Sequence, residues 1–264
     1  MLGALLALAS AVSITGLQTG TAGADTQYGP TGIPGGPIFP TTSLTIGNPT
    51  VVHLLHGTSW SGQALENAFN SPTPGSEART WDLNYSNAQR IYFQRLGRAQ
   101  PAWNHVVDAA GSVRLEMQYV PMYRIVHYTS AGAMCLDADS SKGAPSHGAR
   151  VQWVTCDPNW GFAPQQLWFA TPTTRDGYPG VYPSLINVAS AESPSAVFNL
   201  DQAPVLAAGA NIVGQRSPLT ITKRSMAWPG NSAWGYQNIG PVVVRADQQP
   251  CSNKIECLVA GVGR

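Results

Sequence analysis

Residues 135–170 read CLDADSSKGAPSHGARVQWVTCDPNWGFAPQQLWFA. Short apolar runs in this segment are separated by Gly, Pro, Asp and Ser, which are the residues that favour turns. Similar runs, rich in β-branched and aromatic residues, recur along the chain as RIVHY, SVRLEMQYV and PVVVRA. The only convincing helical segment is QALENAF, and strands and helices do not alternate. The sequence therefore predicts an all-β protein.

The chain also contains an internal repeat. A shift of 71 residues places 56–79 on 127–150 without a gap. The matching pairs are His56 with His127, Thr58 and Ser59 with Thr129 and Ser130, Leu65 with Leu136, Glu66 with Asp137, Pro74 with Pro145, and Ala78 and Arg79 with Ala149 and Arg150. A weaker third copy begins near residue 184, where either Asn199 or Asp201 corresponds to Asp137. Units this small are expected to share one core, as a closed barrel capped by hairpins.

The segment 135–170 resembles one repeat of the ricin-type β-trefoil lectins. Repeats of that family read C-L-D, a turn containing Gly, a strand ending in Cys, and then Q-x-W. Here these pieces are Cys135-Leu136-Asp137, Val151-Gln152-Trp153 with Cys156, and Gln166-Leu167-Trp168. The resemblance extends as a pattern over 51–228 and is strongest over 124–170. It implies a β-trefoil of three divergent repeats that follows a signal peptide and a Pro/Gly-rich arm.

The resemblance also implies which parts of the motif are structural. In the family the Trp of Q-x-W packs in the shared core, and its Gln holds backbone across the repeat. Repeat one keeps Gln89-Arg90-Ile91 at this position, and repeat three offers Met226-Ala227-Trp228. Within 51–264 the expected repeats span about 51–121, 122–180 and 181–264.

A carbohydrate-binding pocket in repeat two is what the resemblance implies for function. The family positions assign the carboxylate to Asp137, the strand amide to Gln152, and a polar residue before Q-x-W to Gln165. A carboxylate accepts strong hydrogen bonds from adjacent sugar hydroxyls, and an amide both donates and accepts. An alternative is that Asp137 only stabilises a turn through local backbone hydrogen bonds.

The aromatic residue of such a pocket is missing from its usual place. The family commonly carries it two residues after the strand Gln, where this chain has Val154. Trp153 lies one position earlier and therefore on the opposite face of the strand. Trp160 and His147, in the neighbouring loops, are the candidate substitutes.

The outer repeats match the binding pattern less well. Repeat one has Glu66 in place of the Asp, Trp81 at the position expected for Gln152, and Ala88 at the position of Gln165. Repeat three has only the uncertain Asn199 or Asp201. Repeat two is therefore the expected binding site.

The N-terminus has the pattern of an export signal. Residues 1–24 are apolar at first, then small and polar, and end in Ala22-Gly23-Ala24, which predicts signal-peptide cleavage. A membrane span is the alternative for this stretch. Residues 25–50 carry many Pro and Gly and are expected to form a linker or arm. We expect a secreted, extracellular or cell-envelope protein.

Four cysteines fit an oxidising compartment. Three pairings are open to them, and the short separations favour Cys135 with Cys156 and Cys251 with Cys257. Neither a C-x-x-C pair nor a His cluster accompanies them, so we expect no metal site and no cofactor.

Composition argues against several other functions. The formal net charge is +1 and only 11% of the residues are charged, which does not favour binding to nucleic acid or lipid head groups. The segment 51–68, VVHLLHGTSWSGQALENA, resembles a hydrolase nucleophile elbow at Ser59, but Ser61 replaces the final Gly of G-x-S-x-G. We expect a non-enzymatic protein that binds a glycan or cell-wall polysaccharide. The alternatives are a degenerate trefoil that binds a protein partner, for instance as the delivery or receptor-binding subunit of a toxin, and a secreted hydrolase.

Overall fold

The computed structural model describes residues 49–56, 59–107, 113–158, 163–175, 178–191, 198–200, 202–209 and 217–239. Strands dominate this part of the chain, and its two α-helices, α1 (Val188–Ala191) and α2 (Pro229–Ser232), have four residues each. The predicted signal peptide, most of the predicted arm, Trp160, and the predicted Cys251 and Cys257 pair lie outside the described residues.

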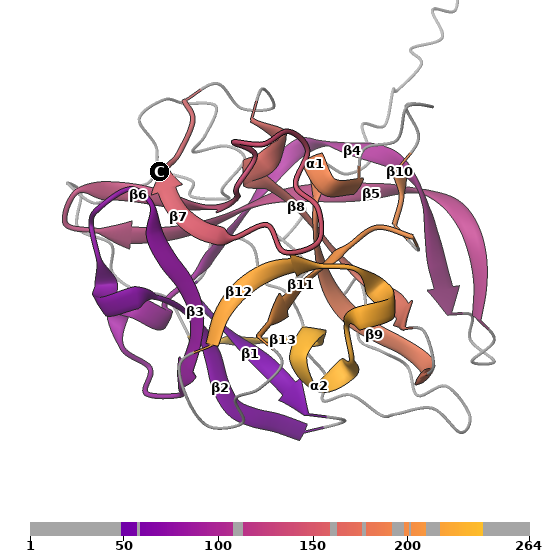
Figure 1. Cartoon of the computed structure of the whole chain (residues 1–264), viewed down its shortest axis with the longest axis horizontal. Helices are drawn as coiled ribbons and strands as arrows, with labels where there is room; N and C mark the ends of the chain where they lie inside the picture. Colours follow the sequence, from indigo (N-terminus) through magenta and orange to yellow (C-terminus); the bar gives the residue numbers. More distant parts are fainter. Residues whose placement is uncertain are drawn as a thin grey trace, which may run out of the picture.

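Six strands form a barrel (Figure 1). They are β1 (Thr50–His56), β4 (Tyr92–Val107), β5 (Val113–Thr129), β8 (Leu167–Arg175), β9 (Tyr178–Asn187) and β13 (Trp234–Asn238). β13 pairs with β1, β4 with β5, β5 with β8, and β8 with β9. A bridge between Thr50 and Ile91, with hydrogen bonds of 2.7 and 2.9 Å, joins β1 to the start of β4. Contact between β9 and β13 completes the ring.

Three hairpins cap the barrel. They are β2 (Ser59–Asn67) with β3 (Ser76–Asp82), β6 (Gly132–Ala138) with β7 (Val151–Thr155), and β11 (Val205–Ala208) with β12 (Ser217–Thr222). Each hairpin pairs with the next, through Glu77 with Gln152, Arg150 with Thr220, and Pro218 with Arg79. These contacts make a closed triangle in which Glu77, Arg150 and Pro218 are equivalent, as are Arg79, Gln152 and Thr220. A barrel with a threefold hairpin cap is a β-trefoil, so the predicted fold is confirmed.

The core repeats the same symmetry. Leu65, Leu136 and Leu206 are fully buried at equivalent cap positions. The indole Nε1 of Trp168 donates to the carbonyl of Leu136 at 2.9 Å, and that of Trp234 donates to the carbonyl of Leu206 at 3.0 Å. These bonds satisfy a polar ring atom and a carbonyl that would otherwise be buried without partners.

The Gln of the Q-x-W motif is a framework residue, as the resemblance implied. Gln166 donates through Nε2 to the carbonyl of Thr155 at 3.3 Å and accepts from the amide of Asp157 at 2.9 Å. Gln89 makes the same two contacts in repeat one, with the carbonyl of Asp82 at 2.9 Å and the amide of Asn84 at 3.0 Å. Each Gln therefore fastens the end of a cap strand to the chain that returns to the barrel.

Strand pairing corrects the gapless repeat alignment. Glu66 pairs with Arg79, and Asp137 pairs with Gln152, so Arg79 and not Trp81 is the counterpart of Gln152. The loop that follows Asp137 is two residues longer than its counterpart after Glu66. The alignment was therefore wrong beyond that loop, because hydrogen-bond register and not sequence spacing determines which residues are equivalent.

The prediction for repeat three was also wrong. Ala207 pairs with Thr220 and therefore occupies the position of Asp137, whereas Asn199 lies in β10 (Phe198–Asn199), paired with β4. The buried tryptophan of the repeat is Trp234 and not Trp228, which is only partly buried. Repeat three lacks both the Asp of the C-L-D motif and the Gln of the Q-x-W motif. Its sequence therefore could not be aligned with the other repeats at these two positions.

The segment that resembled a hydrolase elbow is a hairpin. β1 and β2 pair with each other, and His56 lies opposite Ser59 at the end of the ladder. A nucleophile elbow requires a strand-to-helix turn, whereas this segment goes from strand to strand.

Candidate functional site

The carboxyl group expected to bind sugar lies in the second cap hairpin. Asp137 is the penultimate residue of β6 and lies opposite Gln152 of β7. The preceding cross-strand pair, Leu136 with Trp153, is fully buried in the core. Because side chains alternate along a strand, Asp137 and Gln152 project from the other face of the hairpin.

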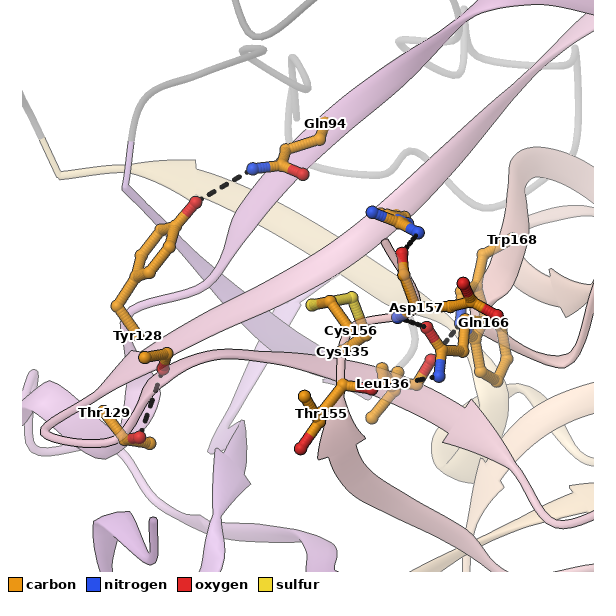
Figure 2. Close-up of a disulfide and its surroundings, with 12 residues drawn as sticks. Gln94, Tyr128, Thr129, Cys135, Leu136, Thr155, Cys156, Asp157, Gln166 and Trp168 are labelled. Atoms are coloured by element: carbon orange, nitrogen blue, oxygen red, sulfur yellow. Dashed lines mark hydrogen bonds between the residues drawn. A yellow bond between two sulfur atoms is a disulfide. The ribbon is translucent and has the colours of Figure 1, made fainter. Parts of the chain in front are cut away.

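Two amide side chains lie beside the Asp137 carboxyl group. Gln152 lies directly opposite Asp137 across the hairpin, and both Gln152 and Gln166 are close enough to favour the charged form of the carboxyl group. The Asp137 residue is 6% exposed. The Cys135–Cys156 disulfide joins β6 to the residue that follows β7 (Figure 2). Figure 2 also shows Gln166, bonded to Asp157, beside Trp168. The framework Gln of the repeat is therefore also part of the candidate site.

Burial raises the pKa of Asp137 to about 6, and the hydrogen bonds from Gln166 and Gln152 oppose this rise. Loss of hydration disfavours the charged form of a carboxyl group, and two neutral amides only partly compensate. The site therefore offers a poorly hydrated carboxylate at neutral pH. Such a group gains from further hydrogen-bond donors, and sugar hydroxyls are donors of this kind.

The family pattern assigned Gln165, the polar residue before Q-x-W, to the binding site. Gln165 lies in the 3-10 helix Pro164–Gln166, is partly exposed, and its carbonyl accepts from Asn187 Nδ2 at 2.7 Å. The amide that contacts Asp137 belongs to the next residue, Gln166. The motif itself could have indicated this, because its Gln must lie close to the end of the cap strand to bond there.

Trp160 lies outside the described residues, and the described candidate rings, those of Trp153 and His147, have partners away from Asp137. Trp153 is fully buried, and its Nε1 donates to the carbonyl of Glu66 at 3.3 Å. Val154 is partly buried on the partner strand, opposite Cys135. His147 is exposed, and its Nδ1 accepts from the amide of Lys223 at 3.4 Å, which places the ring beside repeat three.

Repeat one fills the equivalent position with an ion pair. Arg79 donates to Glu66 Oε1 from Nε at 3.0 Å and from Nη2 at 2.6 Å, and both side chains are almost fully buried. Gln89 donates to the other carboxylate oxygen at 3.4 Å. The carboxylate of repeat one is therefore neutralised by a cation of its own chain.

Two aromatic rings flank that cation. The Arg79 guanidinium carbon lies 4.5 Å from the ring centre of Phe69 and 4.3 Å from that of Trp81. Since Arg79 is equivalent to Gln152, Trp81 is equivalent to Val154, the usual place of the family's aromatic residue. Repeat one thus has the ring that repeat two lacks at this position, but the ring contacts Arg79. Sequence reasoning missed this arrangement because the alignment was displaced by two residues.

Repeat three offers no equivalent chemistry, because Ala207 and Thr220 occupy the positions of the acid and the amide. Of the three equivalent sites, repeat two is the one whose carboxyl group lies beside neutral amides. In the described ranges, no group of three or more His, Cys, Asp or Glu side chains is arranged to hold a metal ion. Those ranges also contain no helix long and apolar enough to cross a membrane.

Comparisons with known proteins give only distant similarity to solved structures. Neither a protein-family model nor a curated protein matches the chain. The designed 3-fold symmetric protein ThreeFoil is 15% identical with a TM-score of 0.45, covering 71% of this chain and 97% of that chain. A mosquitocidal holotoxin is 13% identical with a TM-score of 0.41, covering 73% of this chain and 17% of that chain. The Pmt1-Pmt2 protein O-mannosyltransferase complex of S. cerevisiae is 11% identical with a TM-score of 0.40, covering 82% and 29%. Similarity at this level says nothing about what this chain binds.

Proposed function

We propose that this protein is a carbohydrate-binding β-trefoil of the ricin type, with its binding site in repeat two. The observation that carries the proposal is the buried Asp137 carboxyl group, which lies beside the amide side chains of Gln152 and Gln166 at the end of the second cap hairpin. The ricin-like motif 135–170 supports the same site. The Cys135–Cys156 disulfide is compatible with an exported protein.

The chemistry suits a sugar with two adjacent hydroxyl groups. The carboxylate accepts from both hydroxyls, while the amides of Gln152 and Gln166 fix the orientation of the carboxylate. The position equivalent to Trp81 is occupied by Val154, so little aromatic surface is available to cover the apolar face of the sugar. We therefore expect weak binding of a single sugar, with a dissociation constant of about 1 mM, and useful affinity only for a polyvalent glycan or polysaccharide.

A glycan array followed by calorimetry with the best ligand tests this proposal. We expect one sugar per chain and at least a tenfold loss of affinity in Asp137→Asn, because a charge-assisted hydrogen bond is replaced by a neutral one. Binding should also weaken as the pH falls below about 6, because Asp137 then takes up a proton.

Asp139→Asn is the matched control. Asp139 lies two residues further along, and its carboxylate accepts from the amide of Ser141 at 2.9 Å. We expect this variant to bind as the parent does. Absence of any glycan ligand for the parent chain would refute the proposal, and equal losses in the two variants would show that the site lies elsewhere.

A further inference from the structure

One face of the long β4–β5 hairpin is apolar and exposed. The exposed fractions are 39% for Trp103, 44% for Leu115, 54% for Met117 and 74% for Tyr119. Trp103 lies directly opposite Met117, and Pro101 lies opposite Tyr119. Directly opposed residues of an antiparallel pair share a face, so these side chains form one strip, which we call the ribbon face. A contiguous apolar strip of this kind indicates a binding surface.

The other face of the same hairpin is anchored to the molecule. Ala102 and Val120 are fully buried in a second apolar cluster that also contains Phe169 and Ile186 of the β8–β9 hairpin. Asn104 Nδ2 donates to Thr171 Oγ1 of β8 at 2.7 Å. The hairpin that carries the ribbon face is therefore anchored to the β8–β9 hairpin through its opposite face.

The chain that precedes β1 enters the barrel beside this hairpin. Thr50 forms an antiparallel bridge with Ile91, immediately before β4 begins at Tyr92. Pro101 lies ten residues along β4 from Ile91, and an extended chain rises by about 3.3 Å per residue. The ten residues between positions 40 and 50 are therefore long enough for residue 40 to reach the level of Pro101.

The sequence of residues 33–40 is suited to packing on the ribbon face. Residues 33–40 read IPGGPIFP, with Pro34, Pro37 and Pro40 at every third position. This spacing places all three rings on one side of a polyproline II helix. Proline has no amide hydrogen to donate to a sheet, and β10 already pairs with the edge of β4 at Ala102 and Trp103. The face of the hairpin, and not its edge, is therefore the surface open to such a segment.

We propose that residues 33–40 of the chain dock in polyproline II conformation on the ribbon face of the same molecule. Prolines of such a segment pack between exposed aromatic rings, here those of Trp103 and Tyr119. The tether between Pro40 and Thr50 keeps the local concentration of the segment high, so a weak contact is sufficient. This intramolecular docking surface is independent of the sugar site of repeat two.

Methionine oxidation by hydrogen peroxide, followed by mass spectrometry on the whole chain, tests this proposal. Met226 is 59% exposed and serves as the internal reference for Met117, which has a similar exposed fraction of 54%. If residues 33–40 cover the ribbon face, Met117 should oxidise about fivefold or more slowly than Met226. In the triple variant Pro34→Ser, Pro37→Ser and Pro40→Ser, the two rates should become equal.

Pro30→Ser is the matched control, because it changes the same arm outside the docking segment, and it should leave Met117 protected. Equal rates in the parent chain would overturn the proposal. Protection that survives the triple substitution would show that something else covers the face, such as a different segment or a partner protein. Protection that disappears on dilution would assign the contact to a second copy of the chain. Each of these last two results would refute docking of residues 33–40 within one molecule.

Discussion

At the residue scale, Asp137 combines a proposed role in binding with a cost in stability. Its carboxyl group is nearly inaccessible to water, its partners are neutral amides, and its pKa is raised to about 6. The folded protein therefore binds a proton at this site more readily than the unfolded chain does. Stability contributed by the protonated form falls as the pH rises from about 4 to 6 and is lost above that range.

Asp137→Asn should therefore raise the free energy of unfolding at pH 7.5, by at most about 3 kcal/mol, while it weakens glycan binding. The difference from the parent should shrink at pH 4.5, where the carboxyl group is protonated in the folded state. Urea denaturation at the two pH values measures this effect. Asp139→Asn should not be stabilising, because hydrogen bonds to Ser141 lower the pKa of Asp139. A parent chain more stable than Asp137→Asn at pH 7.5 would contradict the argument.

Repeat one stabilises its buried acid with a cation, Arg79, whereas the acid of repeat two lies beside neutral amides. In repeat one the Glu66 carboxylate is neutralised by a guanidinium group that also contacts the rings of Phe69 and Trp81. The ion pair occupies the position where repeat two presents Asp137 with Gln152. We therefore expect no ligand to bind at this position of repeat one, because the ligand would have to displace a buried cation.

Arg79→Ala should lower the free energy of unfolding by about 3 kcal/mol or more, because it leaves Glu66 buried without its cation. For a domain of this size that corresponds to a drop in Tm of roughly 10 °C in a calorimetric scan. The double variant Glu66→Gln and Arg79→Gln should be more stable than the single one, since no unpaired charge remains. A loss below about 1 kcal/mol for Arg79→Ala would contradict the burial of the pair.

At the scale of elements, the second cap hairpin is the most heavily constrained of the three. The Cys135–Cys156 disulfide closes it, Gln166 fastens the residues that follow β7, and Trp168 bonds to the Leu136 carbonyl. Its counterparts lack the disulfide, since Ala64 of repeat one matches Cys135 in the strand pairing. The hairpin that carries the proposed site is thus also the one in which the geometry of the site is best fixed.

Removing the disulfide should destabilise the protein and weaken the site. The cross-link joins residues 21 apart in the sequence, and a loop of that size contributes about 3 kcal/mol through the unfolded state. The double variant Cys135→Ser and Cys156→Ser should show a correspondingly lower urea midpoint and a reduced affinity for any glycan found. Unchanged stability would mean that the barrel alone holds the hairpin in place.

At the scale of the whole molecule, the fold was predictable because its markers repeat. The alternation of short apolar runs with turn residues indicated strands, and the Q-x-W motif indicated a trefoil. Repeat two could be aligned with the family pattern because Asp137, Gln152 and Gln166 are all retained there. Repeat three was not, because Ala207, Ser232 and Trp234 share only the tryptophan with the pattern.

The sequence by itself determined the all-β class and the presence of internal repeats, favoured the Cys135–Cys156 pairing, and placed Asp137 at the acidic position of the second repeat, since each depends on residue types or on short spacings. Only the tertiary structure showed that Gln166 contacts Asp137, that Arg79 occupies repeat one, and that the β4–β5 hairpin exposes an apolar face. These features depend on the register between strands that are distant in sequence. Register is determined by hydrogen bonding and packing across the whole barrel. Because the loops differ in length, an alignment of one repeat with another along the sequence does not recover it.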